Sequence, residues 1–445
     1  MLLTSALALV DGELRPDFAL RIEGGGIVAA GPRAQIVHPN DAITDLGRKL
    51  MLPGGVNAHC HSFQSLLRGI GDDLPFLQWR ERALYRFTPH ILAHGRSGDL
   101  RARGTYIGAL FAFAEMALHG VSTVCDFFYL NEGGNEHARA VIQAARDIGL
   151  RIVLARCFYD WEGAPAAFRE TPKEATRRFA ELHRAFRGDP MVHIAAAPHS
   201  LHGASAPMIR AAVEAAREAG VRWHMHIAEE KHQVEDSLRR YGRTPLRALD
   251  EIVPIGDDLV VVHGCWLDEG ERALLQERGA ALCYCPGSNM FLGDGVTDIV
   301  DLVRRGVRLA LGTDGGCANS RVSVLDEMRS CALLQKVSRC DGQAITAETC
   351  FAMGTCGGGQ VLGLPVGRLR VGERADVCFA DLDDPSLWPE HSLHKSVVYA
   401  LSARAITDLY VDGQPVVRNR TLCRLPLEEV GRRVRELTQG WRDIL

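Results

Sequence analysis

The chain has 445 residues, of which 47% are hydrophobic and 24% charged, a balance typical of a globular enzyme. A formal net charge of −4 argues against nucleic acid or an anionic membrane as a partner. No apolar run approaches the roughly 20 residues that cross a bilayer, and the apolar start lacks the pattern of a signal peptide.

The cysteines bear on the compartment in which the chain works. There are thirteen, scattered and odd in number, as is typical of a chain with reduced thiols. We therefore expect a cytoplasmic protein. Its expected partner is a small-molecule substrate. A homodimer is the expected assembly, because two-fold symmetry is the commonest.

Three regions follow one another along the chain. Residues 1–50 predict short strands, with Asp11-Gly12 as a turn signal inside ALALVDGEL. From 51 to 362 short apolar runs alternate with helical patterns, some of which end at a glycine, and we count eight such units. This pattern predicts an α/β fold, a (β/α)8 barrel that forms the catalytic domain. Strand patterns return over 363–445, so both termini are expected to form a small β-sandwich domain with a C-terminal helix.

Polar residues stand at the ends of several of these apolar runs. The runs are KLMLPGGVNAHCH, WHMHIAEE, LVVVHG and LALGTDGG. The carboxyl ends of barrel strands meet at one face, where such enzymes carry out their chemistry. The residues expected to meet there are His59, His61, His226, Glu229, His263 and Asp314.

Four of these residues form a candidate set of metal ligands. His59 and His61 are two apart, so in an extended strand both point to the same face. Neutral imidazole suits zinc or iron, and a carboxylate can complete the set. His226 and Asp314 are the expected third and fourth ligands, with Zn²⁺ as the expected ion and Fe²⁺ as the alternative.

Two further observations define this site. His224 lies two residues from His226 and shares its face, but Glu229 follows His226 directly, which favours His226 as the ligand. The presumed fourth strand, VHIAAAPHS, does not end in a lysine that could bridge two metals. We therefore expect a single divalent ion.

The remaining polar residues suggest the chemistry. A bound divalent metal lowers the pKa of water to about 7. His263 could orient or deprotonate this water, with Asp314 sharing the proton, and Glu229 could carry protons to a departing nitrogen. The alternatives are an amidase, a halide-displacing hydrolase and a non-catalytic metal-binding barrel.

Several segments resemble the amidohydrolase superfamily in its aminohydrolase branch. PGGVNAHCH, HIAEE and GTDGGCANS are similar to its signatures on the first, fifth and eighth strands. The resemblance implies one metal held by His59, His61, His226 and Asp314, with Glu229 and His263 in catalytic roles.

A closer resemblance is to formimidoylglutamate deiminases, which release ammonia from a formimino group. It is carried by HSFQSLLRG, FLQWRERALYRF, CDFFYLN and APHSLHG. It implies that Gln64, Arg80, Tyr129 and His199 contact substrate, whereas His202 stands where that family has an arginine for a substrate carboxylate. GTDGGCANSRVSVLDEMR is more similar to deaminases of N-heterocycles, such as guanine, 8-oxoguanine, pterins or s-triazines, which are the alternative substrates.

Overall fold

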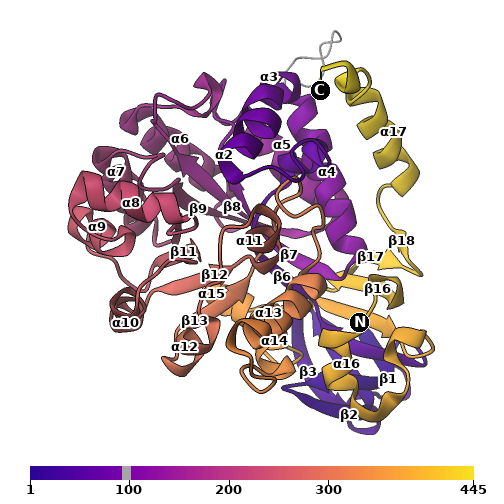
Figure 1. Cartoon of the computed structure of the whole chain (residues 1–445). Helices are drawn as coiled ribbons and strands as arrows, with labels where there is room; N and C mark the ends of the chain where they lie inside the picture. Colours follow the sequence, from indigo (N-terminus) through magenta and orange to yellow (C-terminus); the bar gives the residue numbers. More distant parts are fainter. Residues whose placement is uncertain (93–101, 445) are drawn as a thin grey trace.

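The computed structural model describes residues 1–92 and 102–444 (Figure 1). Its larger part is a closed barrel of parallel strands, in which each strand pairs with the next along the chain. The eighth strand is in two pieces: the first pairs with the seventh strand and the second pairs with the first strand, which closes the circle. The predicted (β/α)8 barrel is therefore confirmed. Its strands are β6 (Gly55–His61), β7 (Val121–Phe128), β8 (Arg151–Phe158), β9 (Val192–Pro198), β10 (Trp223–Ile227), β11 (Leu259–His263), β12 (Ala281–Tyr284), β13 (Arg308–Leu311) and β14 (Asp314–Gly315).

Helices connect the strands and surround the barrel (Figure 1). Three of them, α5, α7 and α10, end at Gly149, Gly220 and Gly279, each in the left-handed conformation that the sequence predicts for these caps. Among the described residues, none of the helices is both long and apolar enough to cross a membrane. The main barrel helices are α4 (Arg103–Leu118), α5 (Glu136–Ile148), α6 (Pro172–Phe186), α7 (Ala206–Ala219), α8 (Lys231–Tyr241), α9 (Pro245–Ile252), α10 (Glu269–Arg278), α11 (Pro286–Leu292), α12 (Ile299–Arg304), α13 (Val324–Arg339), α14 (Ala347–Met353) and α15 (Cys356–Leu362).

Both termini form the second sheet, as the strand patterns at the two ends predict. Its strands form one hydrogen-bonded path with β4 at its side, and residues from both halves of the sheet share a separate apolar core. The C-terminal helix is α17 (Leu427–Leu437). The strands are β1 (Leu2–Val10), β2 (Glu13–Glu23), β3 (Gly26–Pro32), β4 (Ile43–Asp45), β5 (Lys49–Pro53), β15 (Val377–Asp381), β16 (Ile406–Val411), β17 (Gln414–Arg418) and β18 (Thr421–Leu422).

The expected boundary at residues 50 and 51 is wrong by a few residues, because it falls inside β5. This strand pairs with β1 and β15 in the small sheet, and the barrel begins at β6. The apolar run KLMLPGGVNAHC is thus two strands in two sheets, separated at Gly54. A continuous apolar run does not reveal such a division, because both strands are buried.

A buried ion pair joins the small sheet to the barrel. Arg151 at the start of β8 contacts Asp376, with Nη2 3.0 Å from Oδ1, and both side chains are almost fully buried. The backbone N–H of Asp412 and the hydroxyl of Thr123 also donate to this carboxylate. These contacts satisfy a charge that would otherwise be costly to bury.

We expect Asp376→Ala to lower the free energy of unfolding by about 3–5 kcal/mol, because it leaves the Arg151 charge buried without its main partner. The matched control is Asp383→Ala, which removes a surface pair with Arg48 and should cost less than about 1 kcal/mol. Urea denaturation of the two variants measures both values. Equal losses would show that the junction does not depend on this pair.

Candidate active site

Six polar side chains meet at the carboxyl end of the barrel. Their ligand atoms form three overlapping groups, and within each group all atoms lie within 4.8 Å of one another. The groups are His59–His61–Asp314, His59–His226–His263 and Glu229–His263–Asp314. All six residues are buried. The structure therefore brings together every residue that the strand ends predicted for this face.

The backbone bends sharply where some of these residues stand. His263 has φ +69°, Asp314 has φ +58° and Ala228, just before Glu229, has φ +51°. Residues with a Cβ rarely adopt this left-handed conformation, and such strain clusters at functional sites. Here it occurs where β11 ends, where β14 begins and just after the end of β10.

Hydrogen bonds orient the rings of His61 and His226 and set which ring nitrogen is free to bind a metal. Nδ1 of His61 lies 2.6 Å from the carbonyl oxygen of Phe127, and Nδ1 of His226 lies 2.9 Å from that of His199. A carbonyl only accepts, so each Nδ1 carries the hydrogen and each Nε2 keeps a free lone pair. Metal-binding histidines are oriented in this way by their outer partners.

His59 provides the test of whether a metal fits. Its side chain is fully buried, and neither ring nitrogen has a hydrogen-bond partner among the described residues. Nε2 of His59 and Nε2 of His61 lie 3.4 and 3.3 Å from Oδ1 of Asp314. An unpaired buried imidazole is unfavourable, and an ion between these atoms would supply the missing partner.

Burial keeps these imidazoles in the form that binds a metal. It lowers the pKa of His59 to about 3 and also lowers the pKa values of His61 and His226. All three are therefore neutral at neutral pH, which is the form that ligates. The donor set of three imidazoles and one carboxylate suits zinc.

His224 belongs to a different layer of the barrel. It is buried, its Nδ1 lies 4.0 Å from Sγ of Cys125, and it is in none of the three groups. His226 is in the cluster, as the sequence argument favoured.

Glu229 and His263 face each other beside the candidate ligands. Nε2 of His263 lies 3.4 Å from Oε1 of Glu229, and the backbone N–H of Glu229 donates to Oε1 of Gln233. Burial and then the charge of Asp314 raise the pKa of the Glu229 carboxyl well above its usual range. A carboxyl group with a raised pKa can hold and release a proton near neutral pH.

A cleft opens onto this cluster. All five predicted substrate contacts line it, namely Gln64, Arg80, Tyr129, His199 and His202. Aromatic rings make up much of the remaining wall. They are Phe76, Trp79, Tyr85, Tyr159 and Phe168.

Sequence reasoning missed some of these rings. Tyr159 directly follows β8, so the strand-end argument could have found it. Tyr85 lies within FLQWRERALYRF, one of the segments that carry the resemblance. Phe168 ends a short 3-10 helix, Ala166–Phe168, between β8 and α6, and no local pattern indicates that it reaches the cleft.

Two polar groups in the cleft already have partners. Nε2 of Gln64 donates to the Tyr129 hydroxyl, and its Oε1 accepts from Sγ of Cys317 at 3.3 Å. Arg80 lies over the rings of Tyr85 and Trp161 at 5.0 and 5.3 Å, and its Nη2 is 2.9 Å from Glu81. The positions of both side chains are thus fixed by neighbouring groups.

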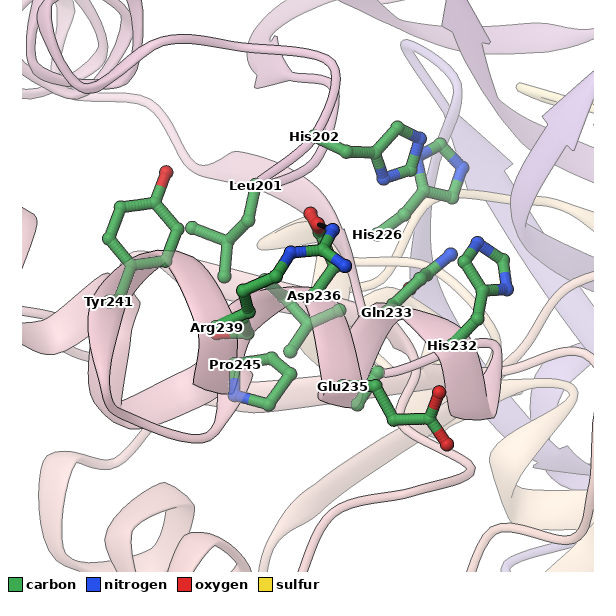
Figure 2. A pocket seen from close by; sticks show the side chains of 13 residues that line it. Leu201, His202, His226, His232, Gln233, Glu235, Asp236, Arg239, Tyr241 and Pro245 are labelled. Atoms are coloured by element: carbon green, nitrogen blue, oxygen red, sulfur yellow. Dashed lines mark hydrogen bonds and ion pairs between the residues drawn. The ribbon is translucent and has the colours of Figure 1, made fainter.

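A second pocket lies beside the cleft, along α8. Figure 2 shows His202 and His226 together at one side of it, with Gln233 and His232 of α8 close by. His202 and His226 line both the cleft and the second pocket, so these two side chains lie between the cleft and that pocket.

The barrel and its buried cluster define a metal-dependent hydrolase of the (β/α)8 type. The chain belongs to the amidohydrolase family, which residues 50–416 match. It is 34% identical to 5-methylthioadenosine/S-adenosylhomocysteine deaminase from Syntrophobacter fumaroxidans, covering 99% of this chain and 98% of that protein. The enzyme of the same name from Pyrococcus furiosus is 31% identical, over 89% and 90% of the two chains.

A solved structure has the same architecture. The zinc-bound crystal structure of an adenosine deaminase from Xanthomonas campestris superposes with a TM-score of 0.90 at 28% identity, covering 99% of this chain and 98% of that one. The protein is therefore a hydrolase acting on carbon–nitrogen bonds other than peptide bonds.

The finer resemblance to formimidoylglutamate deiminases is not supported, because these relatives are named for nucleoside deamination. Barrels of this type act on many different substrates, so similarity in these segments does not identify the substrate.

Proposed function

We propose that the protein deaminates an adenine-type N-heterocycle, replacing the exocyclic amino group with oxygen from water and releasing ammonia. The observation that carries this proposal is the aromatic cleft that ends at the candidate metal cluster. Flat ring walls suit a planar heterocycle, and the relatives named for adenosine-type substrates support the same class.

His59, His61, His226 and Asp314 would hold a single divalent ion, with zinc favoured by the donor set. When bound, this ion would supply a water activated for attack on carbon. Asp314 is further fixed by the hydroxyl of Ser288, which donates to its Oδ2 at 2.6 Å.

Glu229 would move the protons. Its raised pKa lets the carboxyl carry a proton to a nitrogen of the substrate, which weakens the bond to the leaving amine. His263 would hold the attacking water by a hydrogen bond, since its ring lies in the same buried group as Glu229 and Asp314.

Gln64 and the aromatic rings would orient the substrate. The Gln64 amide can pair with the edge of a heterocycle, and its contact with Tyr129 fixes its orientation. Phe76 and Trp79 lie with ring centroids 5.7 Å apart on the same wall.

His202 argues against a substrate with a free carboxylate, such as a formimino amino acid. Burial and then the charge of Arg80 lower the pKa of His202 to about 4, so its ring is neutral at neutral pH. Arg80 is the one arginine among the described residues that line the cleft; its Nη2 pairs with Glu81, and its buried Nε has no hydrogen-bond partner among those residues. A neutral imidazole does not replace the charged fork that grips a carboxylate.

The test is ammonia release from a panel of substrates by the zinc-loaded enzyme. The panel contains adenosine, 5-methylthioadenosine, guanine, a pterin, an s-triazine and a formimino amino acid. We expect turnover of the adenine-type compounds and none of the formimino compound. Turnover restricted to the formimino compound would overturn the proposal, as would no ammonia from any heterocycle.

A further inference from the structure

His263 differs from two other histidines of the cluster, His61 and His226, in the partner of its Nδ1. His61 and His226 face carbonyl oxygens at this atom, whereas Nδ1 of His263 lies 3.1 Å from Nδ2 of Asn289 on α11. Asn289 is 1% exposed. It lies 26 residues from His263, so the contact depends on the folding of the seventh barrel unit.

Asp294 determines which way the Asn289 amide points. Its Oδ2 accepts a hydrogen bond of 3.0 Å from the same Nδ2 atom. Burial and then a hydrogen bond with Glu230 raise the pKa of the Asp294 carboxyl to about 11, so this group carries a hydrogen that it shares with Glu230. The structure directs Nδ2 of Asn289 at Oδ2 of Asp294, so the NH₂ group of the amide faces an acceptor there. The second hydrogen of that NH₂ group is then directed at Nδ1 of His263.

The consequence concerns the tautomer of His263. Because Nδ1 accepts a hydrogen bond, the single hydrogen of the neutral ring lies on Nε2. This is opposite to His61 and His226, whose Nε2 atoms keep free lone pairs. Nε2 of His263 faces Oε1 of Glu229 at 3.4 Å, where an N–H group is a suitable donor.

Neighbouring contacts hold this arrangement in place. The Thr297 hydroxyl donates to the carbonyl of His263 at 2.8 Å, and Nε1 of Trp266 donates to the carbonyl of Asp294 at 2.7 Å. His263 and Asp294 are almost completely buried, so water does not compete for their hydrogen bonds.

We propose that Asn289, oriented by Asp294, is a positioning residue that keeps the proton of neutral His263 on Nε2. His263 then donates a hydrogen bond inside the centre instead of becoming an additional metal ligand. The inference rests on the proposed function for its catalytic consequence, but the tautomer itself does not depend on the substrate.

The decisive variant is Asn289→Asp, which has the same shape but replaces the donor with an acceptor. In the zinc-loaded wild type, ¹⁵N NMR of histidine-labelled protein should show His263 protonated at Nε2. The signal is assigned by its loss in His263→Gln. In Asn289→Asp the proton should move to Nδ1, and an unchanged tautomer would overturn the proposal.

Kinetics provide the second measurement. We expect Asn289→Asp and Asn289→Leu to lower kcat by about 10²-fold or more, the range for misplaced proton donors, with little change in KM. Asp294→Asn can still accept through its amide oxygen and should retain most of kcat, whereas Asp294→Leu should behave like Asn289→Leu.

Two outcomes would contradict the positioning role: equal kcat losses in Asp294→Asn and Asp294→Leu, or loss of zinc from folded Asn289→Leu. If no heterocycle in the panel is turned over, the proposed function fails. The NMR result would still decide the tautomer, so the two failures can be distinguished.

Discussion

Glu229→Gln should abolish turnover and leave the metal bound. Glutamine has nearly the same shape as glutamate but does not carry a proton, and general acid–base groups contribute about 10²–10⁴-fold to rate. We expect kcat to fall by at least about 10³-fold, because Glu229 faces His263 at 3.4 Å inside the cluster and its raised pKa suits proton transfer.

The matched control is Glu235→Gln. Glu235 is exposed on α8 and lies outside the cluster, so the variant should keep nearly full activity. Ammonia release gives kcat, and atomic spectroscopy gives zinc per chain. Turnover close to wild type in Glu229→Gln would refute its role, and loss of zinc would instead make Glu229 a ligand.

The second large effect is expected from a pair of histidines on one strand. His226→Leu should lower the affinity for the metal by more than about 100-fold and abolish turnover. Removing only an outer partner of a metal ligand already lowers the affinity by up to about 100-fold, and His226 belongs to the cluster of candidate ligands itself. His224→Leu should keep both, because His224 is in none of the three groups of candidate ligands and leucine has a similar volume.

Zinc per chain after dialysis and ammonia release measure both variants side by side. They share strand, face and substitution, so a general effect on β10 would appear in both. Equal zinc loss in the two would contradict the assignment of His226, and zinc loss in His224→Leu alone would reverse it.

The barrel was predictable because its pattern is local and repeated. Each buried parallel strand is a short apolar run, and each crossover helix shows its own period and often a glycine cap, as at Gly149 and Gly220. The boundary between β5 and β6 was not predictable, because two buried strands in different sheets form one apolar run.

The six residues of the candidate site were also predictable as a group. Parallel strands bring their carboxyl ends to one face, so polar residues at the ends of apolar runs must meet there. The choice between His224 and His226 was harder, because alternation gives the two the same face and only their depth in the barrel differs.

Local patterns along the chain predict the barrel and the six residues that gather at the carboxyl ends of its strands, because strand period and strand ends are local features of a sequence. What surrounds these residues depends on tertiary packing. Phe168 reaches the cleft from a short 3-10 helix, and Asn289, which Asp294 contacts, reaches His263 from the next unit of the barrel. These contacts join residues distant in sequence, so their geometry depends on how the whole barrel packs rather than on any local pattern.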